Sequence, residues 1–122
     1  LTGTSGVEVL SAARLSKEQT RARNKETLLE IINSTELSDA QKQEAVDSMV
    51  RMTDIAEKEA AAEVLLQAKG FQEAVVSING DAVDVVINAA ELSDAQRAQI
   101  EDIVKRKTDI AAENIVISTI VQ

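Results

Sequence analysis

The sequence predicts an α/β fold of the α+β type. Two N-terminal helices, the second of them long, are followed by strand, strand, helix and strand, with the helices packed on one face of a three-stranded sheet. Apolar residues recur at helical spacing through the first half of the chain. An Asn79-Gly80-Asp81 turn then separates two runs rich in Val and Ile, which is typical of a β-hairpin. The hexapeptide ELSDAQ occurs at 36–41 and again at 91–96, and its composition is that of a helix start.

The composition argues against enzyme chemistry. Phe71 is the only aromatic residue among 122, and the chain has no His, Cys, Trp, Tyr or Pro. The usual nucleophile–base pairs, thiolate chemistry and ordinary zinc sites are therefore excluded. Carboxylate pairs can hydrolyse glycosides, but sugar sites need aromatic platforms that one Phe cannot supply. We expect a protein that is not an enzyme, with no catalytic residue, no cofactor and no metal.

The charge distribution argues against nucleic acid and anionic lipid as partners. The net charge is −8, and residues 36–122 carry eight Lys or Arg against seventeen acids. Nucleic-acid affinity depends on neutralising phosphates with basic side chains. The alternative is a KH-like nucleic-acid-binding module, suggested by the G-T-S-G of Gly3 to Gly6. A KH domain needs that loop between two helices, whereas here it lies at one end of the chain.

Residues 1–10 are expected to be a flexible terminus and residues 11–122 a single domain. The first helix is predicted over about 11–32. Its apolar residues recur every seven positions and thicken near the end: Leu15, Ala22, Leu29, with Leu28, Ile31 and Ile32. Its basic residues form a basic cluster: Lys17, Arg21, Arg23 and Lys25.

The repeated hexapeptide is interpreted as a helix-capping device. Ser38 and Ser93 can each accept a hydrogen bond from the backbone three residues on, and the Gln at that third position can reach back. The similarity extends to a Thr-Asp-Ile-Ala segment in register, 55 residues apart. Two origins remain open, shared capping chemistry or a decayed duplication, and the first is favoured because the copies diverge afterwards.

The second helix is predicted over about 39–69, on the order of 45 Å long. Gly70 is placed to end it in a left-handed cap, and Asp54 and Lys58 are spaced for an i,i+4 ion pair. Its acidic residues are interpreted as a solvated surface: Asp47, Asp54, Glu57 and Glu63.

Strands are predicted over about 71–78, 82–89 and 115–121, with a helix over about 94–107. The basic triplet at 105–107 suits the negative end of that helix. For the sheet we expect strand one in the middle, antiparallel to both neighbours, because this gives an all-antiparallel split arrangement.

Candidate sites are few. Asp81 and Asp84 flank the hairpin turn, but the ligand spacing of a calcium loop is missing. A sheet face that is half apolar, or a free strand edge, is a standard place for another chain to bind. The candidate partner-interface residues are Phe71, Val75, Val86 and Val116.

Several segments together resemble the SpoIIIAH family, the stage III sporulation protein AH of endospore-forming bacteria. They span about Arg14 to Ile120 and are, in order, 14–19 (RLSKEQ), 26–33 (ETLLEIIN), 57–59 (EKE), 65–71 (LLQAKGF), 74–76 (AVV), 99–104 (QIEDIV) and 113–115 (ENI). No one of these motifs is chemically specific; their joint order and spacing carry the resemblance.

The resemblance implies a non-enzymatic assembly module similar to the ring-building domains of the YscJ and FliF families. It implies SpoIIQ, anchored in the forespore membrane, as the partner, in a channel-like complex across the intermembrane space. It also implies homo-oligomeric rings, and an extracytoplasmic location after a mother-cell membrane anchor upstream of residue 1.

Overall fold

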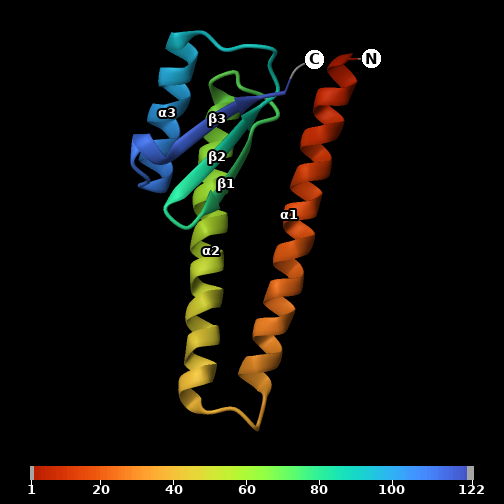
Figure 1. The fold of residues 1–122 in the computed structure, drawn as a ribbon, viewed down its shortest axis with the longest axis vertical. Helices are drawn as coiled ribbons and strands as arrows, with labels where there is room; N and C mark the ends of the chain where they lie inside the picture. The colour runs from red at the N-terminus through yellow and green to blue at the C-terminus, as the bar shows by residue number, and fades with distance from the viewer. Residues whose placement is uncertain (1, 121–122) are drawn as a thin grey trace.

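The computed structural model describes residues 2–120 (Figure 1). Its elements are, in order, α1 (Thr2–Asn33), α2 (Asp39–Ala68), β1 (Val75–Asn79), β2 (Ala82–Ile87), α3 (Asp94–Thr108), the 3-10 turn η1 (Ala112–Asn114) and β3 (Ile115–Thr119). This order confirms the predicted α+β class. The long helices α1 and α2 run antiparallel, and their connected ends extend beyond the sheet as a two-helix arm (Figure 1).

The strand order is β1-β2-β3, with β1 and β2 antiparallel and β2 and β3 parallel. The prediction that strand one is central is wrong. The reason lies on the outer edge of β1, where side chains of α1 and α2 occupy the hydrogen-bonding positions that a third strand would need. Strand β3 therefore pairs with β2, on the other side.

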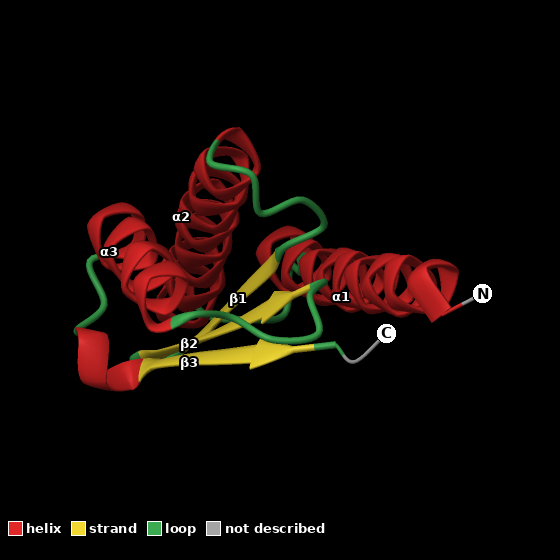
Figure 2. Ribbon diagram, turned by 90° about the horizontal axis from the view of Figure 1, so that it is seen from above, coloured by secondary structure: helices red, strands yellow, loops and turns green. Residues whose placement is uncertain are grey.

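The core lies between the sheet and the two helices α2 and α3, which cover one of its faces (Figure 2). It is built from aliphatic residues and Phe71, as the composition requires. Among its most deeply buried members are Leu66, Val76, Val85, Ile100 and Val104, each fully buried. Helix α1 runs beside α2, next to β1 (Figure 2).

The capping prediction is confirmed at both copies of the repeat. The hydroxyl of Ser38 accepts a hydrogen bond from the Gln41 N–H at 3.2 Å, and the Ser38 N–H donates to the Gln41 side chain at 3.0 Å. Ser93 and Gln96 make the same reciprocal pair at 3.1 and 2.9 Å. These bonds satisfy N–H groups that have no partner within the helix.

The two copies of the repeat then differ in backbone conformation at one residue. Asp54 lies inside α2 and pairs with Lys58 at 3.2 Å, as predicted. Its counterpart Asp109 has a φ of 61° and ends α3 in the left-handed conformation. The continuation of α2 buries Ala62 and Leu66 in the core, so tertiary packing, not the local sequence, decides which copy continues as helix.

The first helix begins earlier than predicted. It starts at Thr2 rather than near Ser11, so residues 2–10, expected to be a flexible terminus, form its first turns. Leu10 is only 2% exposed, and this burial outweighs the low helix propensity of the glycines that precede it.

The first two strands are shorter than predicted, at 75–79 and 82–87. Phe71 donates its N–H to Leu66 O, and Glu73 has a φ of 57°, so the chain becomes extended only after both. Strand β3 ends at Thr119; residue 121 of the predicted strand lies outside the described residues. Within 2–120, no helix is long and apolar enough to cross a membrane.

Candidate partner interface

Two carboxylates of α2 bond to the outer edge of β1. Glu63 Oε2 accepts a hydrogen bond from the Val76 N–H at 2.8 Å, and Glu59 Oε2 accepts one from the Ile78 N–H at 2.7 Å. These two residues of β1 turn their backbone groups away from β2, because alternate residues of a strand face opposite sides. The carboxylates lie one helical turn apart and so take the place of a neighbouring strand's carbonyls.

Two basic residues of α1 bond to the carbonyls of the same edge. Arg14 Nη2 donates to Ala74 O at 2.7 Å, and Lys17 Nζ donates to Val76 O at 2.9 Å. With the two carboxylates, they bond to two N–H groups and two carbonyls along this edge. We call this set of side chains, Arg14, Lys17, Glu59 and Glu63, the edge cap.

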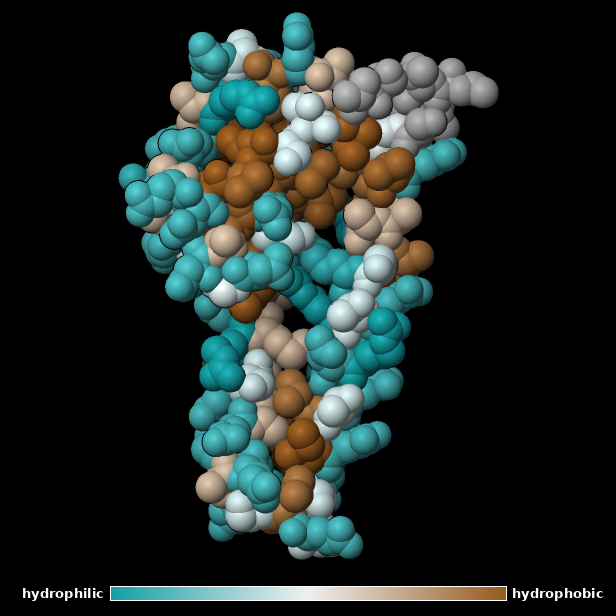
Figure 3. All heavy atoms as spheres, in the orientation of Figure 1, coloured by the Kyte–Doolittle hydropathy of each residue, from teal (hydrophilic) through white to brown (hydrophobic). Residues whose placement is uncertain are grey.

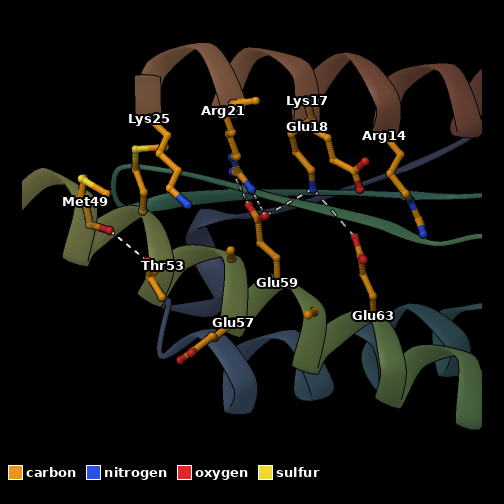
Figure 4. A pocket seen from close by; sticks show the side chains of 14 residues that line it. Arg14, Lys17, Glu18, Arg21, Lys25, Met49, Thr53, Glu57, Glu59 and Glu63 are labelled. Carbon is orange, nitrogen blue, oxygen red and sulfur yellow. Dashed lines mark hydrogen bonds and ion pairs between the residues drawn. The ribbon is translucent and has the colours of Figure 1, made fainter. Parts of the chain in front are cut away.

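Glu59 is the centre of the edge cap and is 3% exposed. Arg21 donates to both of its oxygens, with Nη2 to Oε2 at 2.8 Å, and Lys17 Nζ lies 3.3 Å from Oε1 (Figure 4). Burial raises the pKa of Glu59, but the hydrogen bonds from Arg21 and Ile78 and the nearby positive charges outweigh it. The pKa therefore lies below its usual value, and the carboxylate stays ionised at neutral pH.

The edge cap corrects the sequence interpretation of Glu63 and shows what two residues of the basic cluster bind. Glu63, assigned to a solvated acidic face, is bonded to β1, and Lys17 and Arg21 of the basic cluster pair with Glu59. The available signal was the spacing: the acids are four apart on one helix, and the bases recur at three and four residues on the other. The spacing could not indicate that a strand edge lies between these acids and bases.

A groove of about 600 Å³ lies between α1 and α2 next to the edge cap (Figure 4). Its apolar lining comes from Met49, Met52 and Ala56 of α2 and Ala22 of α1, and charged side chains surround it. The two helices are thus joined by ion pairs at this level rather than by a continuous apolar core.

The predicted interface residues divide between the core and the surface. Phe71 packs in the core, and Val75 is 4% exposed, so neither offers area to a partner in this structure. Val86 pairs with Val75 across the hairpin and is half-buried. Val116 on β3 is 52% exposed. Apolar residues gather over the sheet on the face away from α2 (Figure 3).

The β3 edge differs from the β1 edge. Strand β3 lies at the other side of the sheet, and within the described chain no hydrogen bond from α1 or α2 reaches it. The Ile120 N–H donates to Ile87 O on β2, so the N–H groups of Ile117 and Thr119 face outward. Among residues 2–120 these two N–H groups have no hydrogen-bond partner, and they lie beside the exposed Val116.

The described side chains contain no group of three or more potential ligands that could hold a metal ion. The G-T-S-G segment lies within α1 rather than in a loop between helices, which removes the structural basis of the KH-like alternative.

The family model described as SpoIIIAH-like protein matches residues 2–117. The chain belongs to the SpoIIIAH-like family. The resemblance drawn from the sequence is therefore confirmed.

Two relatives of this SpoIIIAH-like chain are informative. Stage III sporulation protein AH of Bacillus subtilis strain 168 is 25% identical over 107 residues, which is 88% of this chain and 49% of that protein. The chain thus spans about half the length of this curated relative. A chain in the solved structure of the SpoIIQ-SpoIIIAH pore forming complex has a TM-score of 0.83 at 23% identity, and the match covers 93% of this chain and 98% of that one. That likeness shows a shared fold.

Proposed function

We propose that this SpoIIIAH-like chain is a non-enzymatic assembly module that binds a SpoIIQ-like partner through the β3 edge and the adjoining outer face of the sheet. The observation that carries the proposal is the contrast between the two edges. The edge cap closes β1, whereas β3 presents outward N–H groups beside Val116. A partner strand added at β3 gains main-chain hydrogen bonds there, and Val116 gives it an apolar contact.

The family and the fold shared with the SpoIIQ-SpoIIIAH complex support this choice of partner. In the proposal the chain forms a single ring-building-like domain, able to join rings, in a channel-like complex between the mother-cell and forespore membranes. Its membrane anchor lies upstream of residue 1, and the domain is extracytoplasmic.

The test measures binding of the SpoIIQ ectodomain to surface variants of this chain. Val116→Glu should weaken binding by more than tenfold, about 1.4 kcal/mol, with an unchanged melting temperature. The control is Val64→Glu, because Val64 is 65% exposed but lies on α2, away from the sheet. Equal loss with both variants would point to a nonspecific charge effect and contradict the proposal.

A second substitution tests the strand edge itself. Thr119→Pro removes an outward N–H, and a proline is tolerated on an edge strand when its missing N–H faces solvent. Binding should fall while the fold persists. Val75→Glu should instead unfold the domain, because Val75 is buried. Full binding by Thr119→Pro would exclude strand addition at β3.

A further inference from the structure

Helix α1 contributes little to the hydrophobic core. The core cluster takes its buried members from α2, the strands, α3 and the segment between α2 and β1, and none of them lies among residues 6–33, the part of α1 whose side chains are described. Within that part, Leu10 is the only large apolar side chain that is buried. The core is therefore built by the elements within residues 39–120, which we call the body.

The side of α1 that faces the body is charged, whereas a helix ordinarily turns an apolar stripe toward the core. At the level of the sheet, its half-buried residues are Arg14, Lys17 and Arg21, spaced three and four positions apart. The apolar Leu15 and Leu29 are instead 55% and 39% exposed. Helix α1 thus meets the body mainly through cationic side chains.

These cations bond to acceptors of the body. Lys17 and Arg21 keep 19% and 28% of their side chains exposed. An ion pair close to solvent contributes little net free energy, because both partners become hydrated when they separate. Apolar burial has no such compensation, so the body is held together more strongly than α1 is held to it. The acceptors are Ala74 O, Val76 O and the carboxylates of Glu59 and Glu63.

The contact between α1 and α2 is also interrupted. The groove of about 600 Å³ lies between the two helices beside the edge cap. The chain connects them at the tip of the arm, through residues 34–38, where the Ser34 N–H donates to Ile31 O and the Glu36 N–H to Ser34 Oγ (Figure 1). Both bonds are local, so α1 can move away from the body while it stays tethered at this tip.

We infer that α1 is a releasable cover, which undocks from α2 and β1 as a unit while the body stays folded. Local opening of this kind is expected of an element with few buried apolar contacts. The N–H groups of Val76 and Ile78 keep their bonds to Glu63 and Glu59, because both carboxylates belong to α2. Release does not involve β3, so it is independent of the proposed function.

Release uncovers a surface that accepts hydrogen bonds. The groups that lose their bonds to α1 are the carbonyls of Ala74 and Val76 and the carboxylates of Glu59 and Glu63. A neighbouring strand needs donors and acceptors in alternation, so the uncovered edge still does not admit one. Its acceptors suit cationic side chains instead. The surface under α1 is therefore acidic and closed to strands.

Thiol labelling tests the release, because the chain has no Cys. Leu10→Cys and Val104→Cys each carry a single thiol, the first in α1 and the second in the core, at positions that are at most 2% exposed. Under native conditions, dithionitrobenzoate should label Leu10→Cys about tenfold faster or more, because release of α1 uncovers its thiol, whereas Val104→Cys reacts only when the body opens. Circular dichroism checks that both variants are folded.

A second substitution tests whether the charged bonds hold α1 in place. Arg21→Met should raise the labelling rate of Leu10→Cys about tenfold or more and leave the rate of Val104→Cys unchanged. The matched control is Arg23→Met, since Arg23 is exposed and its side chain bonds to Thr20 of the same helix. The control should change neither rate.

Native-state hydrogen exchange of the unsubstituted chain is an independent measurement. Amides of residues 10–21 should exchange about tenfold faster or more than those of residues 100–104, because a helix without tertiary packing is marginal in water. Equal exchange in the two segments would overturn the inference. Equal labelling of the two thiols, or equal acceleration of both by Arg21→Met, would also overturn it, because each result would show that α1 opens only together with the body.

Discussion

Glu59 of α2 and Ile78 of β1, 19 positions apart in the sequence, are joined by a hydrogen bond of 2.7 Å from the strand's N–H to the carboxylate. An acidic side chain thus occupies the place of a strand, and it can be buried there because Arg21 and Lys17 neutralise it. Losing the charge leaves Lys17 and Arg21 without their ionic partner, although an uncharged oxygen can still accept from the Ile78 N–H.

Glu59→Gln should therefore destabilise the domain by about 3 kcal/mol at pH 7. This value is near the low end of the cost of breaking a buried ion pair, because the side chains of Lys17 and Arg21 can become hydrated again. Urea unfolding followed by circular dichroism measures the change. Glu44→Gln is the matched control, since Glu44 is an exposed residue of α2 and has no ion pair in the described chain; its effect should stay below about 0.5 kcal/mol.

The contribution of Glu59 should also depend on pH. Its folded-state pKa is depressed, so its stabilisation is complete above the unfolded-state pKa of about 4.3 and disappears as the pH falls through the folded-state value. The stability difference between wild type and Glu59→Gln should be constant above about pH 5.5 and should shrink below pH 4. A difference that persists unchanged to pH 2 would show that the carboxylate charge is not its source.

The two serine caps should contribute independently. Ser38→Ala and Ser93→Ala should each cost about 1 kcal/mol, because each removes the acceptor of an otherwise unpaired N–H at a helix start. The helix starts are separate, so the double variant should cost about 2 kcal/mol. Partner binding at saturating concentration should be unchanged. Binding lost without any loss of stability would mean that the repeat is a recognition motif.

The two aspartates of the repeat should respond in opposite directions to glycine. Asp109→Gly should stabilise the domain by about 0.5 kcal/mol, because glycine adopts a positive φ without steric cost. Asp54→Gly should destabilise it by about 1 kcal/mol, through lower helix propensity and the lost pair with Lys58. Thermal unfolding of both variants measures the contrast, and a shift of the same sign in both would refute this explanation of where the copies diverge.

Features that depend on a few neighbouring residues could be predicted from the sequence. The capping boxes at Ser38 and Ser93, the hairpin turn at Gly80 and the helix end before Gly70 all follow from local hydrogen bonding or from a positive φ. The family resemblance supplied the proposed partner, which no local pattern could indicate.

Features that depend on distant segments could not be predicted. The strand order follows from whether the β1 edge is free, and that edge is occupied by side chains up to 60 positions away. Glu63 looked like a surface residue because its sequence neighbours give no sign of β1. The burial of Val75 likewise depends on the tertiary structure. The alternation of residues along its strand suggested that Val75 is exposed on the outer sheet face, whereas it is buried.

The two edges of the sheet differ, because side chains occupy one edge and leave the other open. A sheet with two free edges can add strands at both sides and grow into a fibril, which folded proteins avoid by blocking edges with charge. Here the ionised Glu59 and its neighbours occupy one edge at neutral pH, so in the proposed binding mode each domain accepts one strand, at β3, and has no second edge to offer. Strand addition therefore ends after a single step, and the number of partners bound in this way is limited to one per domain.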